Sequence, residues 1–100
     1  MKILYLVPGP MGRSPEGKVE LARRGSLLAK YAAPGTETGI EDVPEGPASI
    51  ESMYEEYLSI PATVRRAVEL EQSGEWDAII LGCYGDPGLD ALREMVSLPV

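Results

Sequence analysis

The sequence predicts an α/β domain, an open parallel sheet in a three-layer arrangement with helices on both faces. Apolar, β-prone runs alternate along the chain with segments of helical periodicity, in the order strand, helix, strand, helices, strand, helix. This alternation is typical of parallel strands joined by right-handed crossovers. A length of 100 residues suits one domain and is too short for two, so we expect residues 1–100 to form a single unit.

The first half of the chain is expected to hold two strands and one helix. Residues 2–7 are apolar and predict a buried strand, which Pro8-Gly9-Pro10 ends. Apolar residues at helical spacing predict a helix over residues 16–31, and Pro34-Gly35 stops it. Near-alternating apolar and polar residues predict a second strand over residues 36–43.

Two further helices are expected before the third strand. Ser49 is predicted to cap a short helix that ends at Tyr57 or Leu58. A separate helix is expected to begin near Pro61, because proline suits the first turn of a helix, and to end at Ser73-Gly74.

The last quarter carries the strongest strand signal. Residues 76–81 end in an unbroken apolar run typical of a central parallel strand covered on both faces. A glycine-rich turn follows, and Asp86 is expected to cap a helix that reaches about Val96. Residues 98–100 resemble the start of a fourth strand. Because the sequence stops there, we expect the chain to be truncated or split.

Composition excludes several classes of protein. Nine Lys and Arg against 16 Asp and Glu give a net charge of −7, which argues against a nucleic-acid partner. The apolar run at residues 3–7 is too short for a signal peptide or a membrane span, so no membrane partner is expected. The chain has no histidine, so a His-based triad or metal site is excluded, and no metal is expected. Cys83, the only cysteine, fits a reducing cytoplasmic location.

Two strand ends mark the candidate site. Ligands of open parallel sheets bind outside the carboxyl ends of the strands, where Pro8 and Gly9 follow the first strand and Cys83, Tyr84 and Gly85 follow the third. The predicted helix start after Cys83 favours its thiolate, a better base or nucleophile than the thiol. A buried structural cysteine at the end of a core strand fits the same position, and both interpretations stay open.

Two other cysteine motifs are excluded because the residues that they require are absent. A cysteine phosphatase loop requires arginine where Leu89 stands, and thioredoxin-type chemistry requires a second cysteine where Asp86 stands.

Two longer segments carry a family resemblance. Residues 46–52 read Gly-Pro-Ala-Ser-Ile-Glu-Ser, and residues 76–90 run from Trp-Asp-Ala-Ile-Ile-Leu-Gly-Cys to Tyr-Gly-Asp-Pro-Gly-Leu-Asp. With Tyr54 and the closing Leu-Pro-Val of residues 98–100, the chain resembles the aspartate/glutamate/hydantoin racemase superfamily. The resemblance is closest to hydantoin racemases and concerns their N-terminal half.

This resemblance implies one flavodoxin-like half of a two-domain, cofactor-independent racemase that uses neither pyridoxal phosphate nor a metal. Cys83 falls on the cysteine of the first half, one of two thiols that remove and return the Cα proton of a substrate from opposite faces. The backbone N–H groups of Tyr84 and Gly85, with those after the first strand, would stabilise substrate oxygen. The implied partners are a small-molecule substrate, a hydantoin or an amino-acid derivative, and further copies in a homo-oligomer.

The chain departs from the family pattern at two places. The first loop reads Val-Pro-Gly-Pro at residues 7–10, where the family usually has Asn-Pro-Asn-Thr, so the polar ligand contacts expected there are missing. The second cysteine is also missing, so we expect the isolated chain to be inactive as a racemase. The alternatives are a non-catalytic α/β module that binds a ligand or assembles with a partner, and a one-thiol decarboxylase or isomerase relative.

Overall fold

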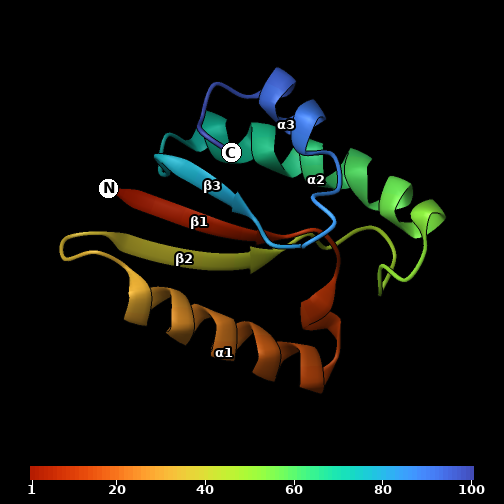
Figure 1. The fold of residues 1–100 in the computed structure, drawn as a ribbon, viewed down its shortest axis with the longest axis horizontal. Coiled ribbons are helices and arrows are strands. Elements are labelled where there is room, and N and C mark those ends of the chain that lie inside the picture. Colours follow the sequence, from red (N-terminus) through yellow and green to blue (C-terminus); the bar gives the residue numbers. More distant parts are fainter.

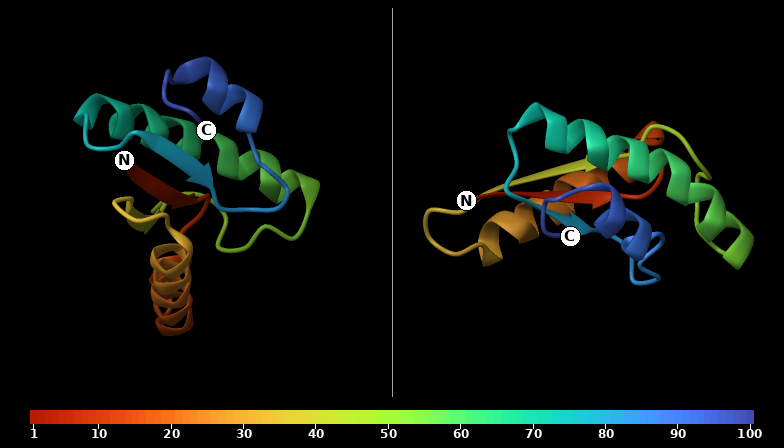
Figure 2. Two further views of the ribbon diagram at one scale, coloured as in Figure 1. Left: turned by 60° about the vertical axis from the view of Figure 1, so that its left-hand side comes forward. Right: turned by 90° about the horizontal axis from the view of Figure 1, so that it is seen from above.

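The computed structural model describes all 100 residues as three parallel strands and three α-helices. The strands are β1 (Lys2–Val7), β2 (Glu37–Asp42) and β3 (Ala78–Leu81), and the helices are α1 (Pro15–Tyr31), α2 (Met53–Ser73) and α3 (Leu89–Met95), with a short 3-10 turn at Met11–Arg13. Helix α1 lies on one face of the sheet, and α2 and α3 lie together on the other (Figure 1; Figure 2, left). The predicted α/β class and its three layers are therefore confirmed.

Strand β1 is the centre of the sheet, whose order is β2-β1-β3. It pairs in parallel with β2 from Lys2 opposite Glu37 to Val7 opposite Asp42, and with β3 from Ile3 opposite Ala78. The prediction that residues 76–81 form the central strand was wrong. An apolar run shows that a strand is hydrophobic, but its neighbours are set by pairing over long sequence distances.

Beside β3 lies the last segment of the chain. The N–H of Ile79 donates to the carbonyl oxygen of Pro99 at 2.9 Å, as a neighbouring strand would accept it. Residues 98–100 are not assigned as a strand, although they lie where the sequence predicted a fourth strand to start. This hydrogen bond to Pro99 is the one strand-like contact that they make with β3.

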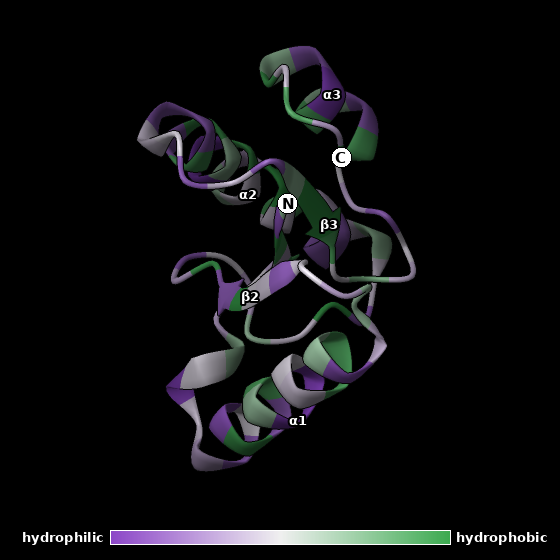
Figure 3. Ribbon diagram, turned by 90° about the vertical axis from the view of Figure 1, so that its left-hand side faces the viewer, coloured by the Kyte–Doolittle hydropathy of each residue, from purple (hydrophilic) through white to green (hydrophobic).

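The hydrophobic core lies between the sheet and the layer of α2 and α3. Leu4, Leu6 and Ile79 point into it from β1 and β3. The remaining buried members come from α2, α3 and the segments that follow β2 and α3: Val43, Ala62, Ala67, Leu70, Leu92 and Val96. Figure 3 shows the strongly hydrophobic β3 beneath this layer. No residue of α1 is fully buried, so the two faces of the sheet are unequally covered.

Helix α2 is continuous, where the sequence predicted two helices. The side chain of Ser52 caps it by accepting a hydrogen bond from the Glu55 N–H at 3.2 Å, so the predicted cap at Ser49 was wrong. Pro61 lies inside the helix. An internal proline costs about 3 kcal/mol because it removes a backbone hydrogen bond. The buried side chains of Ala62, Ala67 and Leu70 nevertheless hold the continuous helix against the sheet.

Helix α3 begins later than predicted. Its N-cap is Gly88, whose φ of 73° lies in the left-handed region, and Asp86 is a turn residue with φ of 47°. Ser14 and Pro15 open α1, close to the predicted start, and β2 falls inside the predicted range. None of the helices combines the length and the apolar character that crossing a membrane requires.

Replacement of Leu6 by alanine tests this core. Leu6 is completely buried on the central strand, so Leu6→Ala should lower the free energy of unfolding by about 2–5 kcal/mol, measured by urea denaturation. Val19→Ala is the control, because Val19 is 71% exposed and its loss should cost about 0.5 kcal/mol or less. Equal effects of the two substitutions would contradict the assigned core.

Candidate active site

A hollow of about 1320 Å³ opens at the carboxyl ends of the strands and continues along the sheet face beside α1. Three loops line the end of the hollow at these strand ends: Pro8 and Gly9 after β1, residues 47–50 after β2, and residues 82–84 after β3. Because all three strands run in the same direction, these loops emerge at one edge of the sheet.

The first two loops touch at Gly9. This residue has φ of 150°, and a Cβ atom there would lie 3.1 Å from the carbonyl oxygen of Pro47. Glycine therefore allows the backbones to approach more closely than a side chain would permit. Pro8, Gly9 and Pro10 are all buried, and the two prolines have a fixed φ, so this wall of the hollow is a closely packed and rigid segment.

Cys83 is half-buried in the turn that follows β3. The N–H of Gly82 donates to the Leu6 carbonyl at 2.8 Å, and the N–H of Cys83 donates to the Leu81 carbonyl at 3.1 Å. The Cys83 carbonyl in turn accepts from the Asp86 N–H at 3.1 Å. These bonds tie the backbone on both sides of the thiol to the end of the sheet.

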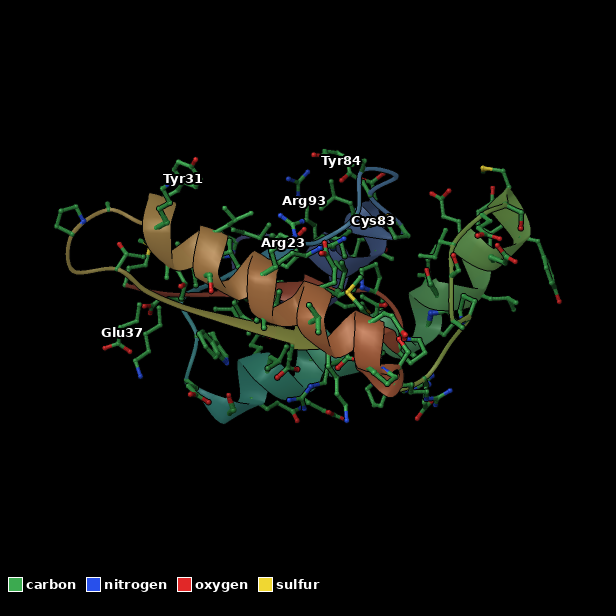
Figure 4. All side chains as sticks on the ribbon, turned by 90° about the horizontal axis from the view of Figure 1, so that it is seen from below. Arg23, Tyr31, Glu37, Cys83, Tyr84 and Arg93 are labelled. Atoms are coloured by element: carbon green, nitrogen blue, oxygen red, sulfur yellow. The ribbon has the colours of Figure 1, made fainter.

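The next two residues in this turn have free backbone donors. The N–H groups of Tyr84 and Gly85 donate to no acceptor within the chain. The Tyr84 side chain is fully exposed and points outward from the loop, whereas Cys83 lies further in (Figure 4). An oxygen of a bound molecule near Cys83 can therefore be met by N–H groups of the same turn.

The loop after β1 contributes no comparable donors. The N–H of Gly9 donates to the Val7 carbonyl and the N–H of Met11 to the Gly9 carbonyl, both at 2.9 Å. Pro8 and Pro10 have no N–H at all. Free backbone donors at this end of the hollow therefore belong to the other two loops. They are the N–H groups of Tyr84 and Gly85 after β3 and those of Ala48, Ser49 and Ile50 after β2, which also donate to no acceptor within the chain.

Two charged side chains of α1 line the hollow. Arg23 and Arg24 line its wall, and both bind the Glu20 carboxylate at 2.8 Å. Hydrogen bonds from Arg23 and then Arg24 lower the pKa of Glu20 to about 2. At neutral pH the cluster of Arg23, Arg24 and Glu20 therefore carries one net positive charge, and Asp86 places a carboxylate in the lining of the same hollow.

The structure brings together most of the predicted site residues. Pro8, Gly9, Cys83 and Tyr84 line the hollow, and Gly85 lies next to it in the same turn. The predicted helix start beside Cys83 is wrong, because α3 begins only at Leu89. No group of three or more Cys, Asp or Glu side chains gathers to hold a metal ion.

Sequence reasoning missed the contribution of the loop after β2. Pro47, Ala48, Ser49 and Ile50 line the hollow, although Ser49 was interpreted as a helix cap. The signal was present in the family-like segment over residues 46–52. Its position directly after a strand could have assigned it to the site.

Comparisons with known proteins agree with this geometry. Residues 21–100 match the family model described as Asp/Glu/Hydantoin racemase. The chain belongs to this racemase family. It is 30% identical over all 100 residues to a hydantoin racemase of Paenarthrobacter aurescens, and the match covers 40% of that protein. Over 55 residues, which are 55% of this chain, it is 53% identical to a hydantoin racemase of Pseudomonas sp. (strain NS671), and this match covers 22% of that protein.

A solved structure supports the fold of this racemase-family chain. Allantoin racemase from Klebsiella pneumoniae superposes on the whole chain with a TM-score of 0.81 at 26% identity, and the match covers 38% of that protein. The chain thus spans less than half the length of the relatives that it matches.

Replacement of Gly82 by alanine tests the packing that holds the Cys83 turn. A Cβ atom at Gly82 would lie 2.2 Å from Cε1 of Tyr5, so Gly82→Ala should lower the free energy of unfolding by about 1–3 kcal/mol, measured by urea denaturation. The control is Gly85→Ala, whose Cβ would meet only the Glu56 carboxylate, at 3.5 Å. If Gly82→Ala were as mild as Gly85→Ala, the assigned contact with Tyr5 would be wrong.

Proposed function

We propose that this chain provides one half-site of a cofactor-independent racemase, in which the Cys83 thiolate removes the proton next to a carbonyl of a hydantoin or amino-acid-like substrate. The observation that carries the proposal is the position of Cys83. The thiol sits at the carboxyl end of β3, inside the hollow, beside the free N–H groups of Tyr84 and Gly85. Membership of the racemase family supports this assignment of the chemistry.

The proposed proton transfer needs only groups of this turn and the substrate. The C–H bond at the stereocentre breaks, its proton forms the thiol at Sγ of Cys83, and the electron pair moves to the adjacent carbonyl oxygen. The resulting enolate oxygen carries negative charge, which the N–H groups of Tyr84 and Gly85 would stabilise. Pro8 and Gly9 would hold the flat ring of the substrate against an apolar wall.

Inversion requires a second acid on the opposite face of the substrate. Cys83 is the only cysteine among the 100 residues, so we propose that this chain exchanges the proton on one face and does not racemise by itself. A second acid would have to come from another polypeptide segment or another copy.

Deuterium exchange separates these two activities. Each enantiomer of 5-benzylhydantoin is incubated with the chain in heavy water, and deuterium at C5 is measured by NMR while polarimetry follows the rotation. We expect exchange of one enantiomer without loss of rotation, at a rate above that of protein-free buffer. The Cys83→Ser variant should lose that excess exchange, because a hydroxyl is a far weaker acid than a thiol.

The outcomes are distinct. Unchanged exchange in Cys83→Ser would contradict the role of Cys83. Exchange together with racemisation would overturn the proposal that the chain lacks a second acid. Absence of any exchange above buffer would overturn catalysis by this chain and favour a non-catalytic binding or assembly module.

A further inference from the structure

A single four-residue turn carries the thiol, the free donors and a carboxylate. The Asp86 N–H donates to the Cys83 carbonyl oxygen at 3.1 Å, which closes a β-turn with Tyr84 and Gly85 at its centre. The Cα atoms at the two ends of such a turn lie less than about 7 Å apart. Cys83 and Asp86 both line the hollow, so one small molecule can reach both of them and the N–H groups between them.

The backbone of Asp86 has a conformation that residues with side chains rarely adopt. Its φ of 47° lies in the left-handed region, and no other residue of the chain except glycine has a positive φ. Aspartate tolerates this region better than most residues, but glycine adopts it without steric cost. The backbone alone does not require a carboxylate here, so the presence of this side chain points to a function.

The carboxylate of Asp86 has no partner within the chain. It is exposed, accepts no hydrogen bond and forms no ion pair. By contrast, the carboxylates of Asp42 and Asp77 hold the fold together, because they accept the backbone N–H groups of Gly12 at 2.7 Å and of Lys2 at 2.6 Å. The acceptor capacity of Asp86 is therefore available to a bound molecule.

A second carboxylate, that of Glu56 on α2, lies beside the same donors. A Cβ atom at Gly85 would lie 3.5 Å from both of its oxygens, and the half-buried Glu56 side chain has no hydrogen-bond partner of its own. Arg23 and Arg24, which line the hollow from α1, are bonded to Glu20 instead. The turn therefore offers N–H donors in surroundings that repel a ligand carrying a carboxylate.

We propose that Asp86 determines specificity by accepting the N–H group that neighbours the substrate carbonyl. The inference rests on the proposed function, in which the N–H groups of Tyr84 and Gly85 meet that carbonyl oxygen. In a hydantoin, the carbonyl next to the reacting carbon is followed in the ring by an N–H group, so one edge of the ring presents an acceptor and then a donor. The turn presents the complementary order, two donors and then a carboxylate. A free amino acid has a carboxylate at this edge, which Asp86 and Glu56 would repel.

Isosteric replacement of Asp86 tests the contact. Asp86→Asn keeps the shape of the side chain and its tolerance of a positive φ but removes the charge. The ¹⁵N-labelled chain is titrated with 5-benzylhydantoin and with N-carbamoylphenylalanine, the ring-opened form that carries a carboxylate. The variant should bind the hydantoin about fivefold more weakly, because a hydrogen bond to a charged group becomes one to a neutral amide. It should bind the carboxylate ligand about threefold more tightly, because one repulsion is removed.

A methylated ligand identifies the N–H group. 3-Methyl-5-benzylhydantoin lacks the donor between the two carbonyl groups, so its affinity should differ by less than about twofold between wild type and Asp86→Asn. The matched control is Asp90→Asn, because Asp90 is also exposed but does not line the hollow. This variant should bind all three ligands like wild type.

The outcomes separate this inference from the chemistry of Cys83. Equal affinities of wild type and Asp86→Asn for each ligand would overturn the role of Asp86 and would not bear on proton exchange by Cys83. An equal loss of affinity for the methylated hydantoin would also overturn the contact. Cys83→Ser should keep the preference for the hydantoin even though it loses proton exchange. A wild-type chain that binds no ligand saturably would overturn the Asp86 contact and the proposed site together.

Discussion

Parallel pairing of β1 with both of its neighbours is the constraint on which the rest of the structure depends. Val7 lies opposite Asp42 and Leu6 opposite Leu81, so all three strands end at one edge of the sheet. The loops that follow are therefore neighbours although they lie far apart in the sequence. Gly9 meets Pro47, and the Gly82 N–H is fixed to the Leu6 carbonyl. Each contact of the candidate site follows from this common edge.

The two faces of the sheet differ in how they are covered. One face packs into the hydrophobic core, and the other lines the hollow. Leu4 and Leu6 of β1 and Ile79 of β3 turn toward α2 and α3, where the hydrophobic core lies. On the other face α1 packs along β2 and leaves Ile80 exposed, so a large hollow remains in contact with the Cys83 turn. A domain that covered both faces equally would have no such hollow.

Local signals in the sequence predicted the local structure well. The apolar run at residues 2–7 and the glycine turn around Cys83 were both placed correctly, because each depends on neighbouring residues alone. The errors came from interactions across the fold. Pro61 stays inside α2 because the helix is buried against the sheet, and β3 lies beside only one of the other strands because pairing is decided by β1. Ser49 joined the site through the position of its loop, which helix-capping rules do not address.

The central claim is that a substrate oxygen is met by the N–H groups of the Cys83 turn, with the β1 loop as an apolar wall. Titration of the ¹⁵N-labelled chain with 5-benzylhydantoin, followed by amide chemical shifts, tests it most directly. The account predicts the largest shifts at Tyr84 and Gly85, which have free N–H groups, with smaller shifts at Gly9. Saturable shifts confined to α2 or α3, with Tyr84 and Gly85 unmoved, would contradict it.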